Sequence, residues 1–186
     1  MSRGSPVLFV HGFASSAEHN WRQPGWLDLL AELGRETIAV DLLGHGRAPR
    51  PTDPAEYASV EDRVAAEISG YEQVDAVGFS AGAYVLLRLA SASPGRFRRL
   101  ADGSGNDRAA LVAFLRRPQR PLTAGDLARI SCPVLVVLGD KDPAGPGEPL
   151  AAALPDAQLV TLRGVDHFGT PSDVRCMQAV LRFLDS

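Results

Sequence analysis

The chain has 186 residues, of which 45% are hydrophobic and 22% are charged, and its formal net charge is −3. This composition is that of a soluble globular protein, and the length suits a single domain with a substantial core. The small net charge argues against a dedicated nucleic-acid-binding protein, and no apolar run approaches the ~20 residues that a membrane-spanning helix needs.

The two cysteines, Cys132 and Cys176, are too few for a disulfide framework. Their apolar surroundings predict buried free thiols. The apolar run at residues 7–10 is too short for the hydrophobic region of a signal peptide. We therefore expect a cytoplasmic protein, with a trimmed mature form of a secreted protein as the alternative.

Apolar runs of strand length alternate with helical patterns along the chain, which is typical of a mostly parallel α/β sheet with helices on both faces. No internal repeat or linker interrupts this alternation, so we expect one domain over residues 1–186. The predicted strands span residues 6–11, 36–41, 73–79, 97–102, 133–138 and 157–162.

Helical patterns lie between these strands. A helix near residue 60 has Ser59 as a candidate cap, with Asp62 three residues later. The last helix has Thr170 as its candidate cap, Pro171 at its first position and Asp173 in its first turn. The expected buried stripes are Trp26, Leu29, Leu30 and Leu33, then Val60, Val64, Ile68 and Tyr71, and finally Val174, Met177, Leu181 and Leu184.

The segment Gly78-Phe-Ser-Ala-Gly82 joins a predicted strand to a predicted helix. A turn this tight crowds the positions two before and two after Ser80, so both must be glycine. It presents the serine hydroxyl at the head of a helix, which is the context of a nucleophile. The pattern alone also fits a glycine-flanked turn with an incidental serine.

The first predicted strand leads into His11-Gly12-Phe13. Glycine permits a sharp turn after the strand, so that the backbone N–H of Phe13 faces the crevice above the sheet. Together with the N–H of Ala81 it would form an oxyanion hole. We interpret His11 as a structural residue that orients this loop through hydrogen bonds.

The second strand ends in the glycine-containing segment 41–47, which matches neither a phosphate-binding loop nor a dinucleotide-binding motif. We interpret it as a structural turn and expect no cofactor. Four histidines and two distant cysteines show no metal-ligand spacing, so we expect no metal site either.

An acid and a base follow later strands. Asp142 lies after the fifth strand, where its carboxylate would reach the same crevice as Ser80, with Asp140 turned into the loop. Asp102, at the end of the fourth strand, is the alternative acid. His167 follows the sixth strand and comes after the serine and the aspartate in chain order. An imidazole there could accept the serine proton while the acid holds its tautomer.

Together these segments resemble the α/β-hydrolase family across nearly the whole chain. The matching motifs are H-G-F at 11–13, D-L-L-G-H-G at 41–46, G-F-S-A-G at 78–82, L-G-D-K-D at 138–142 and G-V-D-H at 164–167. The resemblance implies Ser80 as nucleophile, His167 as base, Asp142 as acid, and the N–H groups of Phe13 and Ala81 as oxyanion donors.

The chain departs from the family pattern in two ways. The family's first two strands, usually an antiparallel hairpin, are missing, which leaves six strands in the expected order 2-1-3-4-5-6. The stretch between Ser80 and Asp142 leaves little room for the helical cap of many relatives, so we expect a small hydrolase without a lid. Its pocket would then be built by loop residues such as Phe13, Trp21, Leu43, Tyr84, Phe168 and the segment 103–130.

The leading function is therefore hydrolysis of a carboxylic ester through an acyl-enzyme intermediate. An acyl thioesterase acting on an anionic CoA- or carrier-linked substrate is the alternative. Its support is an arginine-rich stretch over residues 96–120, with seven arginines against two aspartates. A solvated helical face is the explanation that we favour for that stretch. Lactone hydrolysis and perhydrolysis use the same groups, and a non-catalytic binding module on a hydrolase scaffold is the alternative from another class. The oligomeric state stays open.

Overall fold

The computed structural model describes residues 4–103 and 121–186, with only the backbone at residues 102 and 103. Six parallel strands form one sheet in the order β2-β1-β3-β4-β5-β6. This arrangement confirms the predicted order, and every strand lies within one residue of its predicted bounds. The strands are β1 (Val7–Val10), β2 (Thr37–Val40), β3 (Val74–Phe79), β4 (Phe97–Gly103), β5 (Val134–Gly139) and β6 (Ala157–Leu162).

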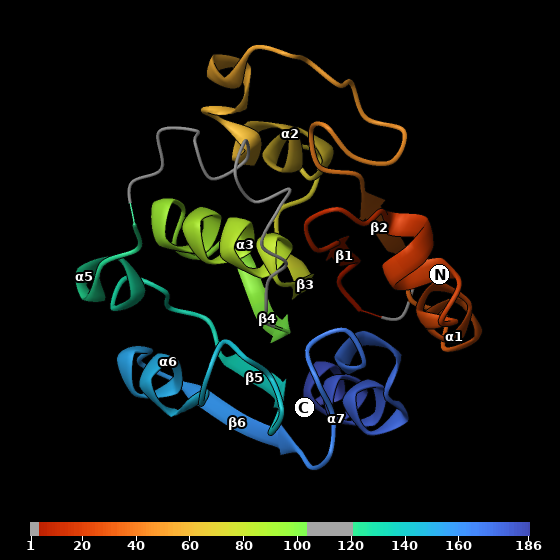
Figure 1. The fold of residues 1–186 in the computed structure, drawn as a ribbon, viewed down its shortest axis with the longest axis vertical. Coiled ribbons are helices and arrows are strands. Elements are labelled where there is room, and N and C mark those ends of the chain that lie inside the picture. The colour runs from red at the N-terminus through yellow and green to blue at the C-terminus, as the bar shows by residue number, and fades with distance from the viewer. Residues whose placement is uncertain (1–3, 104–120) are drawn as a thin grey trace.

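Helices cover both faces of the sheet (Figure 1). On one face lie α2 (Val60–Glu67), α3 (Ala81–Ala92) and α6 (Glu148–Ala153), together with the short α5 (Ala124–Leu127). The other face is covered by α1 (Trp26–Glu32) and α7 (Val174–Asp185). The described residues also contain three single turns: the π-helical η1 (Glu18–Arg22) and the 3₁₀ turns η2 (Pro54–Tyr57) and η3 (Thr170–Ser172).

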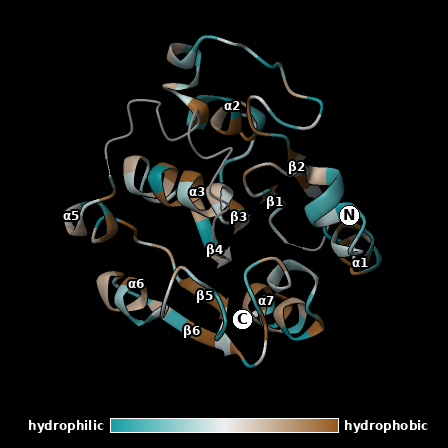
Figure 2. Cartoon of the chain, in the orientation of Figure 1, coloured by the Kyte–Doolittle hydropathy of each residue, from teal (hydrophilic) through white to brown (hydrophobic). Residues whose placement is uncertain are grey.

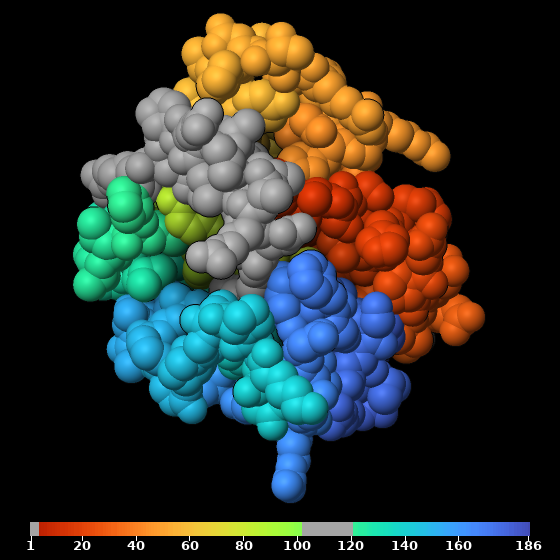
Figure 3. Space-filling model, in the orientation of Figure 1, coloured from red at the N-terminus to blue at the C-terminus, as the bar shows by residue number. Residues whose placement is uncertain are grey.

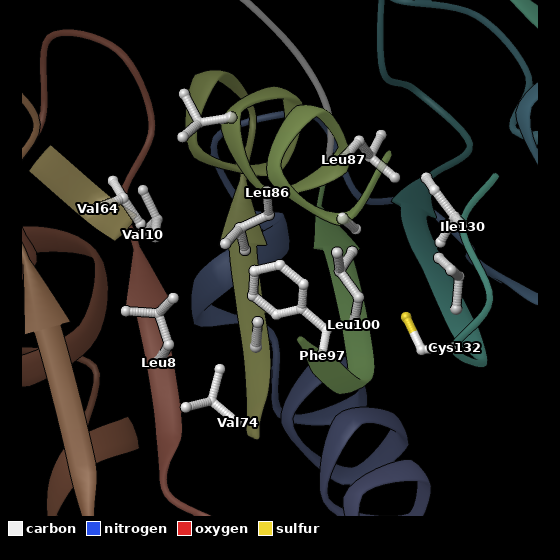
Figure 4. Packing of buried hydrophobic residues seen from close by; sticks show 14 of the residues in the cluster. Leu8, Val10, Val64, Val74, Leu86, Leu87, Phe97, Leu100, Ile130 and Cys132 are labelled. Atoms are coloured by element: carbon white, nitrogen blue, oxygen red, sulfur yellow. The ribbon is translucent and has the colours of Figure 1, made fainter. Parts of the chain in front are cut away.

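The two faces of β1 belong to separate hydrophobic clusters, because side chains alternate along a strand. Leu8 and Val10 pack toward α2 and α3, whereas Val7 and Phe9 pack toward α1 and α7. Figure 4 shows the first of these clusters, with Leu86 of α3 above the sheet. In Figure 2 the inner strand β5 is largely hydrophobic, while β6 at the edge carries hydrophilic residues as well. This contrast is expected between a strand covered on both faces and an edge strand.

Both cysteines are free and buried, as predicted. Burial raises the pKa of Cys132 to about 11 and that of Cys176 to about 12, so neither thiol is ionised at neutral pH. In Figure 4 the Cys132 sulfur lies within the hydrophobic cluster.

The predicted start of the last helix is wrong. Residues 170–172 form the separate turn η3, and α7 begins at Val174 with Asp173 as its cap, whose carboxylate accepts a hydrogen bond from the Arg175 N–H at 2.8 Å. Val174 is 62% exposed because it stands at the open end of the helix. Leu184 is buried as predicted, and Met177 and Leu181 are half-buried against the core. The fully buried residues of α7 are Cys176, Ala179, Val180, Phe183 and Leu184.

Two other helix predictions need correction. Leu33 is exposed because α1 ends at Glu32 and the left-handed Gly34 turns the chain away. Ser59 occupies the cap position of α2, but its side chain makes no capping hydrogen bond. Val60, Val64 and Ile68 are buried as predicted, whereas Tyr71 follows the helix and donates a hydrogen bond to Glu36 at 2.6 Å.

Within the described residues, β1 is the first strand. The segment in which a cap would be inserted falls largely on residues 104–120, outside the described part of the chain; residues 121–130 hold only α5. No helix in the described ranges is long and apolar enough to cross a membrane.

Candidate active site

Ser80 stands in a strained turn between β3 and α3. Its φ of 55° and ψ of −117° place it in a region that residues other than glycine rarely adopt. A Cβ on Gly78 would lie 2.6 Å from the Ala83 Cα, and one on Gly82 would lie 2.2 Å from the Val10 carbonyl oxygen. Both contacts are with backbone, which cannot give way. The prediction that both flanking positions require glycine is therefore confirmed.

The loop after β1 runs directly over this turn. A Cβ on Gly12 would lie 2.7 Å from the Phe79 ring and 3.3 Å from the Ser80 Cβ. This close approach brings the backbone leading into Phe13 next to the serine. The Gly12 N–H donates a hydrogen bond to the Asn20 side-chain oxygen at 3.0 Å. No sequence motif marks Asn20, which lies eight residues away in the π-helical turn η1.

His11 holds the same loop, as predicted. Its Nε2 accepts a hydrogen bond from the Leu42 N–H at 3.0 Å, so its Nδ1 carries the proton and donates to the Gly12 carbonyl oxygen at 2.6 Å. Burial lowers the pKa of His11 to about 4, although the bond to Gly12 opposes this shift. The imidazole is therefore neutral at neutral pH and serves as a fixed bridge between two loops.

The turn after β2 is structural, as predicted. The Asp41 carboxylate accepts hydrogen bonds from the N–H groups of Ala17 and Arg47, both at 2.8 Å. Partial burial raises the pKa of Asp41, but these bonds outweigh it and the pKa lies below its ordinary value. Gly46 is required here, because a Cβ would lie 2.2 Å from the Asp41 carboxylate. The turn thereby ties η1 to the end of β2.

Asp142 and His167 form a buried pair. The His167 Nδ1 lies 3.2 Å from the Asp142 Oδ2, and their side chains are 3% and 0% exposed. The other oxygen of Asp142 accepts a hydrogen bond from the Ala144 N–H at 2.9 Å. The His167 ring is stacked on Phe79, with centroids 4.7 Å apart. The imidazole thus lies against the residue that precedes Ser80.

Backbone contacts bring the loops of Asp142 and His167 together. The Lys141 N–H donates to the Val165 carbonyl oxygen at 3.0 Å, and a Cβ on Gly139 would lie 2.0 Å from that oxygen. Asp140 is turned into the loop, as predicted, and accepts a hydrogen bond from the Gly164 N–H at 2.7 Å. The alternative acid, Asp102, pairs through its backbone with Gly78 and Val136, and its side chain lies outside the described part of the structure.

A family model described as alpha/beta hydrolase fold matches residues 5–101, which include β1, the turn after β2 and the whole Ser80 elbow. The chain belongs to the α/β-hydrolase family. This membership and the names of its relatives support a hydrolase activity.

Two curated relatives match most of this α/β hydrolase. A rat (Rattus norvegicus) protein named putative protein-lysine deacylase ABHD14B is 30% identical over 167 residues, which cover 87% of this chain and 73% of the relative. The putative esterase NocK from Nocardia uniformis subsp. tsuyamanensis is 31% identical over 86% of this chain, but the match spans 46% of that protein.

Solved structures share the fold at lower sequence identity. A bromoperoxidase from Bacillus anthracis superposes with a TM-score of 0.82 at 18% identity, covering 100% of this chain and 93% of that structure. A thermophilic esterase from Thermogutta terrifontis superposes with a TM-score of 0.77 at 20% identity, covering 100% and 91%.

Within the arginine-rich stretch 96–120, Arg96 and Arg98 do not face the site of this hydrolase. Parallel strands begin at the same edge of the sheet, and β4 begins beside Val74, at the end of β3 opposite Ser80. Arg98 is bonded there to the buried Asp75 and to the Leu184 carbonyl oxygen, and Arg96 donates to the Ile68 carbonyl oxygen. An anion-attracting role is therefore wrong for these two. Arg108, Arg116, Arg117 and Arg120 lie outside the described residues.

The side chains predicted to line the substrate pocket of the α/β hydrolase differ in their exposure. Trp21 belongs to the core, where its ring packs on Phe9 at 5.1 Å, and it is not exposed to a substrate. Phe13 is half-buried and packs edge-to-face on His45 at 5.1 Å. Phe168 is 67% exposed with its ring 4.9 Å from His167, which makes it the best placed of these side chains to meet a substrate.

No group of three or more histidine, cysteine, aspartate or glutamate side chains within residues 4–103 and 121–186 could hold a metal ion.

The N- and C-terminal parts of the site are joined directly, because the Trp26 indole N–H donates to the Pro171 carbonyl oxygen at 2.7 Å. Figure 3 shows these segments side by side, the first in red and the second in blue. The β1 loop and the His167 loop are therefore fixed relative to each other.

Proposed function

We propose that this α/β hydrolase cleaves a carboxylic ester through an acyl-enzyme intermediate on Ser80. The observation that carries the proposal is the strained Ser80 turn beside the buried Asp142–His167 pair. A serine held at positive φ is costly, of the order of 1–3 kcal/mol, and such strain is concentrated at functional sites. The esterase names of NocK and of the Thermogutta structure support the ester as substrate class.

In the proposed first step, the Ser80 Oγ attacks the ester carbonyl carbon while the His167 Nε2 takes its proton. The Nδ1–H of the same ring donates to Asp142, which fixes the tautomer and stabilises the imidazolium. The N–H groups of Phe13 and Ala81 would receive the negative charge that develops on the carbonyl oxygen. The tetrahedral species then collapses, the imidazolium gives its proton to the departing alcohol, and the acyl group stays on Ser80.

In the second step a water molecule attacks the acyl carbon and His167 takes its proton. Collapse of this second tetrahedral species returns the proton to the Ser80 Oγ and releases the carboxylic acid. Because the Asp142–His167 pair is buried, the attraction between the carboxylate and the imidazolium formed in both steps is less screened than on the surface.

Cleavage of an amide, with removal of an acyl group from a lysine side chain, is the second candidate. It rests on the rat relative, whose name describes a putative protein-lysine deacylase and whose match covers most of this chain. The same groups would serve, with a lysine amine in place of the alcohol. Thioester hydrolysis loses part of its support, because Arg96 and Arg98 point to the opposite edge of the sheet.

Hydrolysis of p-nitrophenyl esters from C2 to C12 tests the proposal, with wild type and Ser80→Ala compared side by side. An acetyl-lysine peptide and an acyl-CoA thioester run in parallel and compare the substrate classes. We expect Ser80→Ala to lose activity by at least about 10⁴-fold. Ser93→Ala, an exposed serine beyond the other end of α3, is the matched control and should retain wild-type rates.

Wild-type rates in Ser80→Ala would refute the mechanism. Lack of turnover by folded wild-type protein, together with no labelling of Ser80 by a fluorophosphonate probe, would instead favour a binding protein built on a hydrolase fold.

A further inference from the structure

Gly12 is the position in the proposed oxyanion loop where the backbone has the greatest conformational freedom. Glycine is required there, because any side chain would collide with Phe79 and crowd Ser80. A glycine has the greatest backbone freedom of any residue, so sterics alone cannot hold the following N–H group in place. The peptide planes on both sides of Gly12 must therefore be fixed by other groups.

The plane after Gly12 is fixed by His11. The Gly12 carbonyl group and the Phe13 N–H belong to the same planar peptide unit and point in opposite directions. The hydrogen bond from the His11 Nδ1 to the Gly12 oxygen, at 2.6 Å, therefore also sets the direction of the Phe13 N–H.

The plane before Gly12 is fixed by Asn20, whose side-chain oxygen accepts the Gly12 N–H at 3.0 Å. We infer that Asn20 is a positioning residue, which acts through Gly12 to hold the Phe13 N–H in the direction that an oxyanion requires. The inference rests on the proposed function of the Ser80 site.

Asn20 is itself held rigidly. It is 8% exposed and lies in the π-helical turn η1, a rare conformation that occurs frequently at functional sites. Its neighbour Trp21 is anchored in the core against Phe9 and Trp26, with ring centroids 5.1 and 5.7 Å apart. The start of the turn is fixed by the bond from the Ala17 N–H to Asp41. Because the Asn20 side chain is held in this way, its hydrogen bond can fix the position of the Gly12 N–H.

Removing the Asn20 amide should act on the transition state more than on substrate binding, because the oxyanion forms only during the reaction. Loss of an oxyanion donor costs about 10²–10³-fold in kcat. A misdirected donor retains part of its effect, so we expect Asn20→Ala to lower kcat by about 10–100-fold with KM changed by less than about threefold. Asn20→Ser retains an oxygen at this position and should recover part of the loss.

The test measures kcat and KM for a p-nitrophenyl ester, the Ki of a trifluoromethyl ketone and the melting temperature, for wild type, Asn20→Ala, Asn20→Ser and the control His19→Gln. A trifluoromethyl ketone adds to the serine and places an oxyanion in the same hole. We expect its Ki to rise in Asn20→Ala by about the factor by which kcat/KM falls. His19 is the exposed neighbour in the same turn, and its variant should match wild type in all measurements.

Folded Asn20 variants with wild-type kcat and Ki would overturn the inference, and so would a change confined to KM or to the melting temperature. If Asn20→Ala does not fold, Asn20→Ser decides by the same criteria. Failure of the proposed function has a different signature: the ketone would not inhibit wild type, and Ser80→Ala would keep its activity. That result would remove both proposals.

Discussion

Replacing Gly82 by alanine adds a single methyl group at the point where α3 begins against the end of β1. The added Cβ would lie 2.2 Å from the Val10 carbonyl oxygen and 2.6 Å from that of His11. Both neighbours are backbone atoms of the central sheet and its loop, so they cannot rotate away. The start of α3 would have to move by roughly 1 Å to restore ordinary contact.

The size of this movement sets the expected effect. Overpacking of this kind costs about 1–3 kcal/mol of unfolding free energy, which lowers the Tm by roughly 2–12 °C in a chain of this length. Ser80 and the N–H of Ala81 stand at the displaced end of the helix, and a 1 Å error in the placement of reacting groups costs on the order of 10²-fold in rate. Gly82→Ala should therefore remain folded at 25 °C and lose most of its kcat.

Thermal unfolding and p-nitrophenyl acetate kinetics measure the two effects separately. Gly70→Ala is the matched control, because no atom lies within 4 Å of the added Cβ and its φ is not positive. That variant should have wild-type kcat and a stability equal to or up to about 1 kcal/mol above wild type. A Gly82→Ala protein with wild-type Tm and kcat would show that the elbow is not tightly packed and would refute the reasoning.

Asp142→Asn should lower kcat by about 10⁴-fold, because the amide no longer selects the productive His167 tautomer. Asp140→Asn serves as the control. A loss of kcat found in Asp102→Asn but not in Asp142→Asn would reassign the acid to Asp102. The unfolded chain protonates His11 below pH 6.5 and the folded chain only below about 4, so stability should fall by up to about 3 kcal/mol as the pH drops through that window. Urea titrations at pH 7 and pH 4 should show this loss in wild type but not in His11→Gln, and equal losses in both would contradict the pKa. Phe168→Ala should raise KM for long-chain esters several-fold and leave kcat unchanged, since the ring is exposed beside His167; an unchanged KM would place the substrate elsewhere.

The strands could be predicted from the sequence because each is an apolar run bounded by turn residues. β1 and β5 are buried on both faces, so nearly every residue in them had to be apolar. Helix ends were harder to predict. The sequence offers three possible start signals for α7, at Thr170, Pro171 and Asp173. Which one begins the helix depends on the turn η3, which is held by the hydrogen bond from Trp26 to Pro171, between residues far apart in sequence.

Some contacts of the site could likewise be predicted from the sequence, and others could not. The Asp142–His167 contact was predictable, because parallel strands deliver their following loops to one edge of the sheet. The hydrogen bond from Gly12 to Asn20 was not, because a π-helical turn has no sequence pattern that places its side chains. The less favoured hypothesis, an anion-attracting arginine stretch, is wrong for Arg96 and Arg98, since composition does not show at which end of a strand a charge will lie.

Phe79 occupies the variable position of the motif around Ser80, yet both halves of the proposed site rest on it. Its ring lies against the loop at Gly12, where an added Cβ would come within 2.7 Å of a ring carbon. The imidazole of His167 is stacked on the same ring, with an angle of 16° between the planes. The ring thus contacts both the loop that leads to the Phe13 N–H and the proposed base. The choice of side chain at position 79 is therefore constrained by its contacts with the Gly12 loop and with His167, and not by the turn around Ser80.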